Sequence, residues 1–93
     1  MLQSFGDSDT ERVWRRGAVR KFHGELQRVA LRKLVLLDAA ETLADLRVPP
    51  GIRLEKLRGV RAGQYSMRIN DQWRICFRWT KAEPERVTIT DYH

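Results

Sequence analysis

Residues 64–80 (QYSMRINDQWRICFRWT) alternate between apolar and polar side chains in two runs, which predicts a β-hairpin. Residues 70–72 (NDQ) join the runs, and Asn and Asp suit turns because their side chains hydrogen-bond nearby backbone. One face of the hairpin is apolar, with Tyr65, Met67, Ile69, Trp73, Ile75, Phe77 and Trp79. The opposite face carries Arg68, Arg74 and Arg78, so we expect one covered face and one cationic face that could bind an anion.

Helical spacing of apolar residues precedes the hairpin. Residues 24–40 carry a stripe that should cover the apolar face of the hairpin: Leu26, Val29, Ala30, Leu34, Leu37 and Ala40. A shorter helix is predicted to begin near Asp9 and run to Arg16, because Ser8 and Glu11 have the spacing of a capping box. Gly17 is expected to take the left-handed conformation that ends it.

The remaining segments complete an α+β pattern. Residues 2–5 predict an opening strand, residues 42–45 (TLAD) a further turn of helix, and residues 54–57 a short strand after a Pro-Pro-Gly break. Residues 86–92 alternate again and predict a last strand that lies inside the sheet. The fold class is therefore α+β, with two N-terminal helices packed on a mostly antiparallel sheet of four to five strands in a single domain.

Composition restricts the possible functions. The 93-residue chain has a formal charge of +6, and 14 of its 18 cationic residues are arginine, which favours a phosphate or nucleic-acid partner. We find no apolar run near the ~20 residues that span a bilayer. No signal-peptide pattern opens the chain, and the lone Cys76 suggests a reducing compartment, so we expect a cytoplasmic protein. No metal-ligand spacing is present, and no cofactor is expected.

Three groups could converge on the polar side of the sheet and cleave RNA. They are the three strand arginines, a basic turn (Lys56, Arg58 and Arg61) and the terminal residues Asp91, Tyr92 and His93. His93 has a side chain that exchanges protons near neutral pH, fixed cations stabilise a charged transition state, and Tyr92 could stack on a base. Each group also has an ordinary explanation, namely solvated surface cations and a terminal tail.

The sequence resembles a known family at these same residues. The order LEKLRG, RAGQYSMRINDQWRICFRW and terminal ITDYH is similar to the HigB toxins, a branch of the RelE-like toxins of bacterial toxin–antitoxin pairs. SFGDSDTERVWRRG and LRKLVLLDAA resemble that branch as well. The resemblance implies the RelE-like α+β fold, an endonuclease that cuts mRNA in the ribosomal A site, and a helix-turn-helix antitoxin (HigA-like) bound as a hetero-oligomer.

The resemblance also implies residue roles. The catalytic end of the family corresponds to Asp91, Tyr92 and His93, and its arginines correspond to Arg74 and Arg58. Some HigB proteins read LHPLKG where this chain reads LEKLRG, so Glu55 stands in place of a catalytic histidine. Either Glu55 substitutes as the base, or Asp91 and His93 carry the proton transfers.

Two other functions remain open at this point. A ParE-like toxin on the same fold would act on DNA gyrase without this catalytic end. A plain interaction module would use its basic face only to bind an acidic partner, and its affinity for RNA would be weak.

Overall fold

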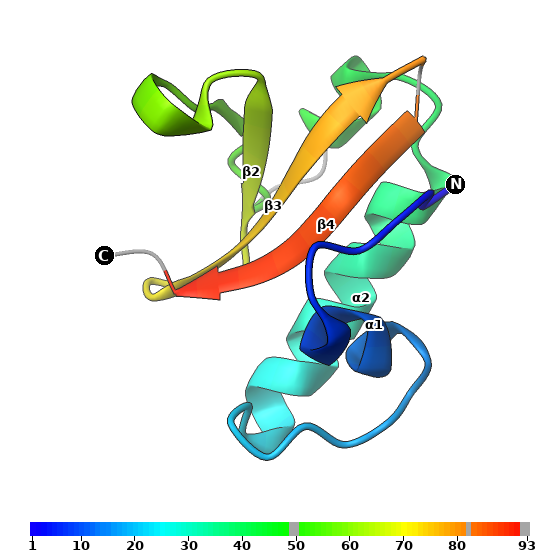
Figure 1. Cartoon of the computed structure of the whole chain (residues 1–93), viewed down its shortest axis with the longest axis vertical. Coiled ribbons are helices and arrows are strands. Elements are labelled where there is room, and N and C mark those ends of the chain that lie inside the picture. The colour runs from blue at the N-terminus through cyan, green and yellow to red at the C-terminus, as the bar shows by residue number, and fades with distance from the viewer. Residues whose placement is uncertain (49–50, 82, 92–93) are drawn as a thin grey trace.

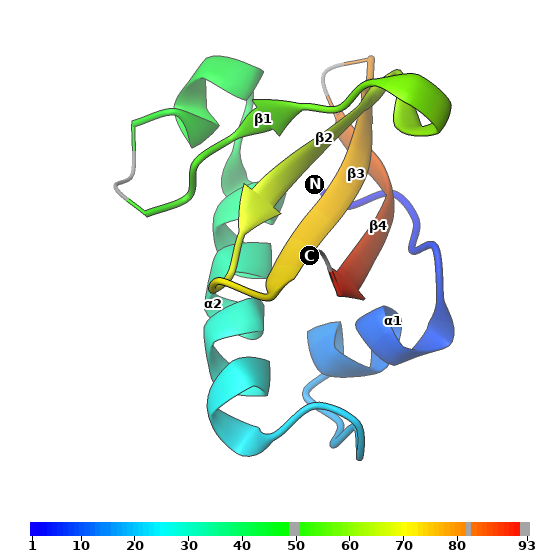
Figure 2. The same ribbon diagram turned by 90° about the vertical axis from the view of Figure 1, so that its left-hand side faces the viewer.

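The computed structural model describes residues 1–48, 51–81 and 83–91, which form one helical layer against one antiparallel sheet (Figures 1 and 2). Their elements in chain order are α1 (Ser8–Trp14), α2 (Gly24–Ala39), the 3-10 helix η1 (Leu43–Leu46), β1 (Glu55–Lys56), the 3-10 helix η2 (Gly59–Arg61), β2 (Gln64–Arg68), β3 (Trp73–Thr80) and β4 (Glu83–Asp91). The α+β prediction with N-terminal helices is confirmed. No helix among the described residues is both long and apolar enough to cross a membrane.

The predicted hairpin is formed by β2 and β3. The sheet order is β1-β2-β3-β4 with every neighbouring pair antiparallel, and Met67 lies opposite Ile75 in the hairpin. Asn70 closes the turn as its residue type suggests, because its side-chain oxygen accepts hydrogen bonds from the backbone N–H groups of Gln72 and Trp73, each at 2.8 Å. The short strand predicted over residues 54–57 is reduced to the two residues of β1.

The outer edge of β4 is closed by the beginning of the chain. The opening strand predicted at residues 2–5 is only an isolated parallel bridge between Phe5 and Val87. Backbone hydrogen bonds hold this segment, including Gly6 N–H to Val87 O at 2.8 Å and Val87 N–H to Ser4 O at 3.1 Å. β4 is thus the last strand in the sheet order, and the expectation of an inner strand was wrong because its outer neighbour does not form a regular strand.

The cap of α1 differs from the prediction. Asp7, not Ser8, is the N-cap, and its side chain accepts a hydrogen bond from Thr10 N–H at 2.8 Å. Thr10 is fully buried, and its hydroxyl oxygen accepts a hydrogen bond from Ile89 N–H at 2.8 Å. The helix begins at Ser8 as a result, and it is tied directly to the outer edge of β4.

The end of α1 also differs in which residue takes the left-handed conformation. Arg16 has φ 65, and the bonds Gly17 N–H to Arg12 O and Arg16 N–H to Val13 O complete a Schellman motif. Gly17 is required for another reason, because a Cβ there would lie 2.7 Å from Arg12 Cγ.

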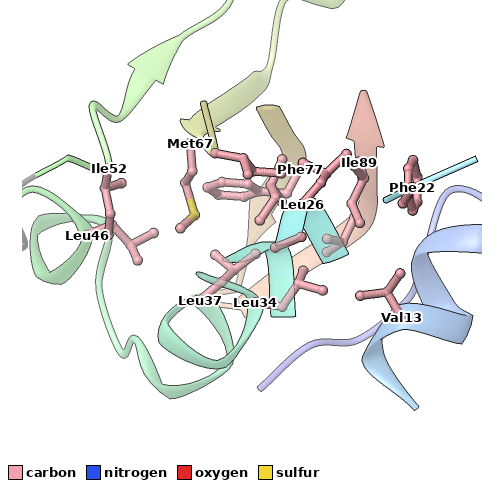
Figure 3. Packing of buried hydrophobic residues seen from close by; sticks show 14 of the residues in the cluster. Val13, Phe22, Leu26, Leu34, Leu37, Leu46, Ile52, Met67, Phe77 and Ile89 are labelled. Carbon is pink, nitrogen blue, oxygen red and sulfur yellow. The ribbon is translucent and has the colours of Figure 1, made fainter. Parts of the chain in front are cut away.

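The core lies between α2 and the sheet, as the helical stripe predicted. Leu26, Ala30, Leu34 and Leu37 are at most 2% exposed and pack against the sheet side chains that Figure 3 shows, such as Phe77. Partly buried aromatic residues, including Trp73 and Trp79, pack on the same cluster, so they belong to the core as expected. The further turn of helix predicted at residues 42–45 is present as η1, which Thr42 and Asp45 close with a capping box.

Candidate functional site

Figure 2 shows the strands β1 to β4 of the sheet. Their register arranges the residues of the polar face, opposite the helices, in rows that cross the strands. Residues directly opposite each other on neighbouring strands project on the same side of a sheet. One row runs through Glu55, Ser66, Cys76 and Thr88, and the next through Arg68, Arg74 and Thr90. Ser66 and Cys76 are fully buried beneath their larger neighbours. The polar face is therefore a packed surface and is only partly accessible to solvent.

Arg74 lies on this face with its side chain mostly buried and hydrogen-bonded to two partners. Its guanidinium donates to Ser66 Oγ at 3.1 Å and to Glu55 Oε1 at 3.3 Å, and only 16% of the side chain is exposed. Burial and two named partners fix the orientation of the planar guanidinium before any ligand arrives. A guanidinium held in this way suits two-point recognition of a phosphate.

Arg68 lies directly opposite Arg74 across the β2–β3 pair, which places two like charges side by side. Such pairs destabilise a sheet unless something compensates them. Arg68 forms an ion pair with the highly exposed Asp71. Burial lowers the pKa of the Lys33 amine on α2, and the positive charges of Arg68 and Arg32 lower it further. The positive field of Arg68 therefore extends to α2. An anion bound between the two strand arginines would relieve this repulsion.

The basic turn does not join this pair. Arg58 is the residue before η2 and Arg61 is its last residue, and η2 leads into the start of β2. Arg74 faces Arg68 at the other end of β2, about 13 Å along the strand at ~3.3 Å per residue. Lys56 lies opposite Tyr65 and therefore has the parity of the helix-side face.

Arg78 does lie on the polar face, where it is exposed and opposite Gln64. Its place is toward the η2 end of β2, so the polar face carries two separate cationic regions. The Arg68–Arg74 pair is at one end, and Arg78 is at the end near Arg58 and Arg61.

The terminal residues divide between what the structure describes and what it does not. Asp91 lies opposite Trp73, so strand parity assigns it to the helix-side face and not to the face of Arg74. Its carboxylate accepts a hydrogen bond from Gln72 Nε2 at 3.2 Å. The predicted site residues Tyr92 and His93 lie outside the described residues. Within the described ranges, no three His, Cys, Asp or Glu side chains come together as metal ligands.

The sequence prediction overlooked the support beneath the arginines. Ser66 is the hydroxyl acceptor that orients Arg74, and Asp71 is the partner of Arg68. A signal for Ser66 was present, because it is a small polar residue at the same parity as the strand arginines. The ion pair between Glu55 and Arg74 could not be predicted from strand parity, because it depends on how β1 pairs with β2.

Comparison with solved structures shows that this fold also occurs in known toxin–antitoxin complexes. Two toxin–antitoxin structures from Staphylococcus aureus, both described as complexes of YoeB and YefM, match the chain with a TM-score of 0.64. Each match covers 100% of this chain and 98% of the other at 17% identity, so it concerns the fold alone.

Sequence comparison adds two bacterial relatives. The toxin HigB-1 of Vibrio cholerae serotype O1 is 46% identical over 54 residues, which are 58% of this chain and 57% of that toxin. The chain thus aligns with less than two thirds of the length of this relative. An uncharacterized protein of Haemophilus influenzae is 33% identical over 69 residues, 74% of this chain and 68% of that protein. These matches do not favour the ParE-like alternative.

The family comparison covers almost the whole sequence. A model of the HigB-like toxins, described as RelE-like toxins of the type II toxin–antitoxin system HigB, matches residues 3–93. The match includes the polar face, the helices that cover the other side of the sheet, and the terminal residues beyond β4. The chain belongs to the HigB-like family of RelE-like toxins of type II toxin–antitoxin systems.

Proposed function

We propose that this protein is an endoribonuclease toxin that cuts mRNA on the ribosome and so inhibits translation. The observation that carries the proposal is the pair of opposed arginines, Arg68 and Arg74, of which Arg74 is already oriented by Ser66 and Glu55. A guanidinium oriented in this way can bind the two non-bridging oxygens of a phosphodiester, and Arg68 on the opposing strand adds a second positive charge nearby. Membership in the HigB-like family supports the same reaction class.

In the proposed reaction the 2′-hydroxyl of one nucleotide attacks the adjacent phosphorus. The hydroxyl proton goes to a side-chain base, the new O–P bond forms, the P–O5′ bond breaks, and the leaving 5′-oxygen takes a proton. The products are a 2′,3′-cyclic phosphate and a 5′-hydroxyl. Arg74 and Arg68 hold the phosphate and stabilise the added negative charge of the transition state. Proton transfer by positioned side chains contributes about 10²–10⁴-fold to such a step.

Glu55 is the described residue best placed to serve as the base beside Arg74. Its carboxylate is half exposed and lies 3.3 Å from the Arg74 guanidinium, so RNA can reach it. The same carboxylate competes with phosphate for Arg74 while the site is empty. His93 is assigned the remaining proton transfer and Tyr92 the stacking on a base, following the family resemblance. Asp91 lies on the helix-side face, so it is left out of this step. Arg58, Arg61 and Arg78 would then follow the RNA backbone at the far end of β2.

The protein would be neutralised by an antitoxin partner. The solved structures with the same fold are described as toxin–antitoxin complexes, and the matching family is defined by such pairs. We propose a helix-turn-helix antitoxin of the HigA type as that partner.

The decisive test maps cuts on a defined message by primer extension, with and without ribosomes. The proposal expects cuts only when ribosomes are present and a loss of at least about 10²-fold in cleavage rate for Arg74→Gln, since a charged hydrogen-bond donor to the transition state is removed. Arg47→Gln is the matched control, because it removes one exposed arginine at the end of η1. Cuts without ribosomes would indicate a free ribonuclease, and no cuts by folded protein would refute the nuclease.

Glu55→Gln separates the two roles of the carboxylate. Loss of the competing anion should strengthen RNA binding while cleavage slows by about 10²-fold or more. If binding strengthens and cleavage keeps its rate, Glu55 only restrains Arg74 and the base is another group.

A further inference from the structure

A second cationic site lies on the helical side of the molecule, away from the polar face of the sheet. An open groove of about 760 Å³ is formed by α1, the loop over residues 17–23 and the first half of α2. Its lining combines four arginines (Arg12, Arg16, Arg20 and Arg28) with the apolar side chains of Val19 and Leu31, among others. Among the residues that the structure describes, the lining includes no acidic side chain.

The walls of the groove are fixed by hydrogen bonds, so the groove exists before a ligand binds. Gln27 of α2 reaches across to the loop, where its side-chain oxygen accepts from Val19 N–H at 3.0 Å and its amide donates to Gly17 O at 2.6 Å. The loop is also anchored below, because Phe22 is 4% exposed and makes an edge-to-face contact with Trp73 at 5.3 Å between ring centroids. A preformed site does not lose binding free energy to ordering of its own walls.

The charge of the groove is not neutralised from within. Acidic side chains nearby are already engaged, since Asp9 pairs with Lys21 and Glu11 with Arg15. Of the lining arginines, Arg28 pairs with Glu25. Arg12 and Arg20 have no ion-pair partner among the described residues.

The apolar part of the groove continues along α2. Leu31 lines the groove, and Val35, one turn further along the helix, is 43% exposed. A nucleic acid would leave this apolar strip unused, because base recognition by stacking needs exposed aromatic rings and the aromatic ring of the groove, Phe22, is buried. An apolar strip flanked by cations is the complement of an amphipathic helix whose polar face is acidic.

We infer that this groove is the docking site for an acidic amphipathic segment of a partner protein. Carboxylates of the segment pair with Arg12 and Arg20 at the rim, and its aliphatic side chains cover Leu31 and Val35. The segment lies against the helices, on the opposite side of the molecule from Arg74. The inference does not depend on RNA cleavage, and it would hold for a chain with no nuclease activity.

Binding of a designed probe tests the inference. The probe is a fluorescein-labelled 16-residue peptide of glutamate and leucine at helical spacing. Fluorescence anisotropy measures its binding to the intact chain. Two comparison ligands are a peptide of the same composition in scrambled order and a 12-nucleotide single-stranded RNA. The amphipathic peptide should bind more tightly than the scrambled one, and its affinity should fall as salt is added.

Charge reversal at the groove provides the critical comparison. The double substitution Arg12→Glu and Arg20→Glu should weaken peptide binding at least tenfold, whereas Arg47→Glu with Lys81→Glu reverses the same charge elsewhere and should weaken it less than threefold. Leu31→Ser tests the apolar floor without changing charge and should also weaken binding. Thermal unfolding by circular dichroism verifies that each variant is folded.

Two results would overturn the inference. If the groove double variant and the control double variant lose peptide affinity equally, the binding is only non-specific charge attraction. A groove double that loses RNA binding while peptide binding is unchanged would make the groove a nucleic-acid site. Cleavage of the ribosome-bound message, measured separately on the same variants, should be unchanged, so failure of the nuclease proposal cannot be mistaken for failure of this one.

Discussion

The contact between Thr10 and Ile89 gives the sharpest prediction about stability. Thr10 is fully buried, and its hydroxyl oxygen is the acceptor for Ile89 N–H on the outer edge of β4. Thr10→Val keeps the shape of the side chain and removes the acceptor. The buried N–H is then left unsatisfied, which costs about 1–3 kcal/mol. For a domain of this size each kcal/mol corresponds to a shift of roughly 4–8 °C in Tm.

Urea unfolding followed by tryptophan fluorescence measures this cost. Thr10→Ser is the matched control, because it keeps the hydroxyl and loses one methyl group, worth about 0.8 kcal/mol of burial. We expect Thr10→Val to be the less stable of the two variants, with an unchanged dependence on urea concentration. A Thr10→Val protein as stable as wild type, or more stable than Thr10→Ser, would show that the hydrogen bond does not hold α1 to the sheet.

Three further predictions concern other positions. Gly6→Ala should lower the free energy of unfolding by about 1–3 kcal/mol, because the new Cβ would lie 2.2 Å from Thr88 Cγ2. Gly24→Ala is the control and should not destabilise the protein, because no atom of the described residues, apart from its chain neighbours and its own helix backbone, lies within 4 Å of a Cβ at that position. Thermal unfolding compares the two variants. Hydrogen bonds from two backbone N–H groups lower the pKa of Asp45, so its contribution to stability is present above the unfolded value of about 4 and is lost as pH falls through the lower folded value. The difference in Tm between wild type and Asp45→Asn should therefore shrink between pH 5 and about pH 2, and a constant difference would contradict this linkage. Arg16→Gly should raise the free energy of unfolding by up to about 1 kcal/mol because φ 65 suits glycine, and a loss of stability in chemical unfolding would mean that its contact with Trp14 matters more.

The parts of the fold that the sequence predicted are those governed by regular periodicity. Period-two alternation located the hairpin, and the stripe beginning at Leu26 located α2 and its buried face. The errors lie at ends and edges. Asp7 and Ser8 are both good caps, and only the extended backbone at Asp7 decides between them. A bulge also places Val87 and Arg86 opposite one residue of β3, with Arg86 at φ 53, and no alternation pattern marks it.

The site was predicted only in part, for a related reason. The strand arginines were found because they share one parity, and that parity is a local property of a strand. Asp91 was grouped with its neighbours in sequence, although adjacent residues of a strand point to opposite faces. The basic turn was grouped with Arg74 by charge, although the length of β2 separates them. Glu55 meets Arg74, 19 residues away, because β2 pairs with both β1 and β3, and a single sequence does not reveal that pairing.

The closure of β4 by the beginning of the chain has a consequence for how the protein matures during its own synthesis. Ser4 and Arg86 are linked across 82 residues, and Thr10 and Ile89 across 79. Contacts between such distant residues form late, because the intervening loop must first be ordered. On a translating ribosome Ser4 and Thr10 are made long before Arg86 and Ile89, so they must wait for β4 to emerge before they find their partners. A chain interrupted after β3 would leave Ser4 and the hydroxyl of Thr10 without their partners, so only a polypeptide translated through Ile89 can form both contacts.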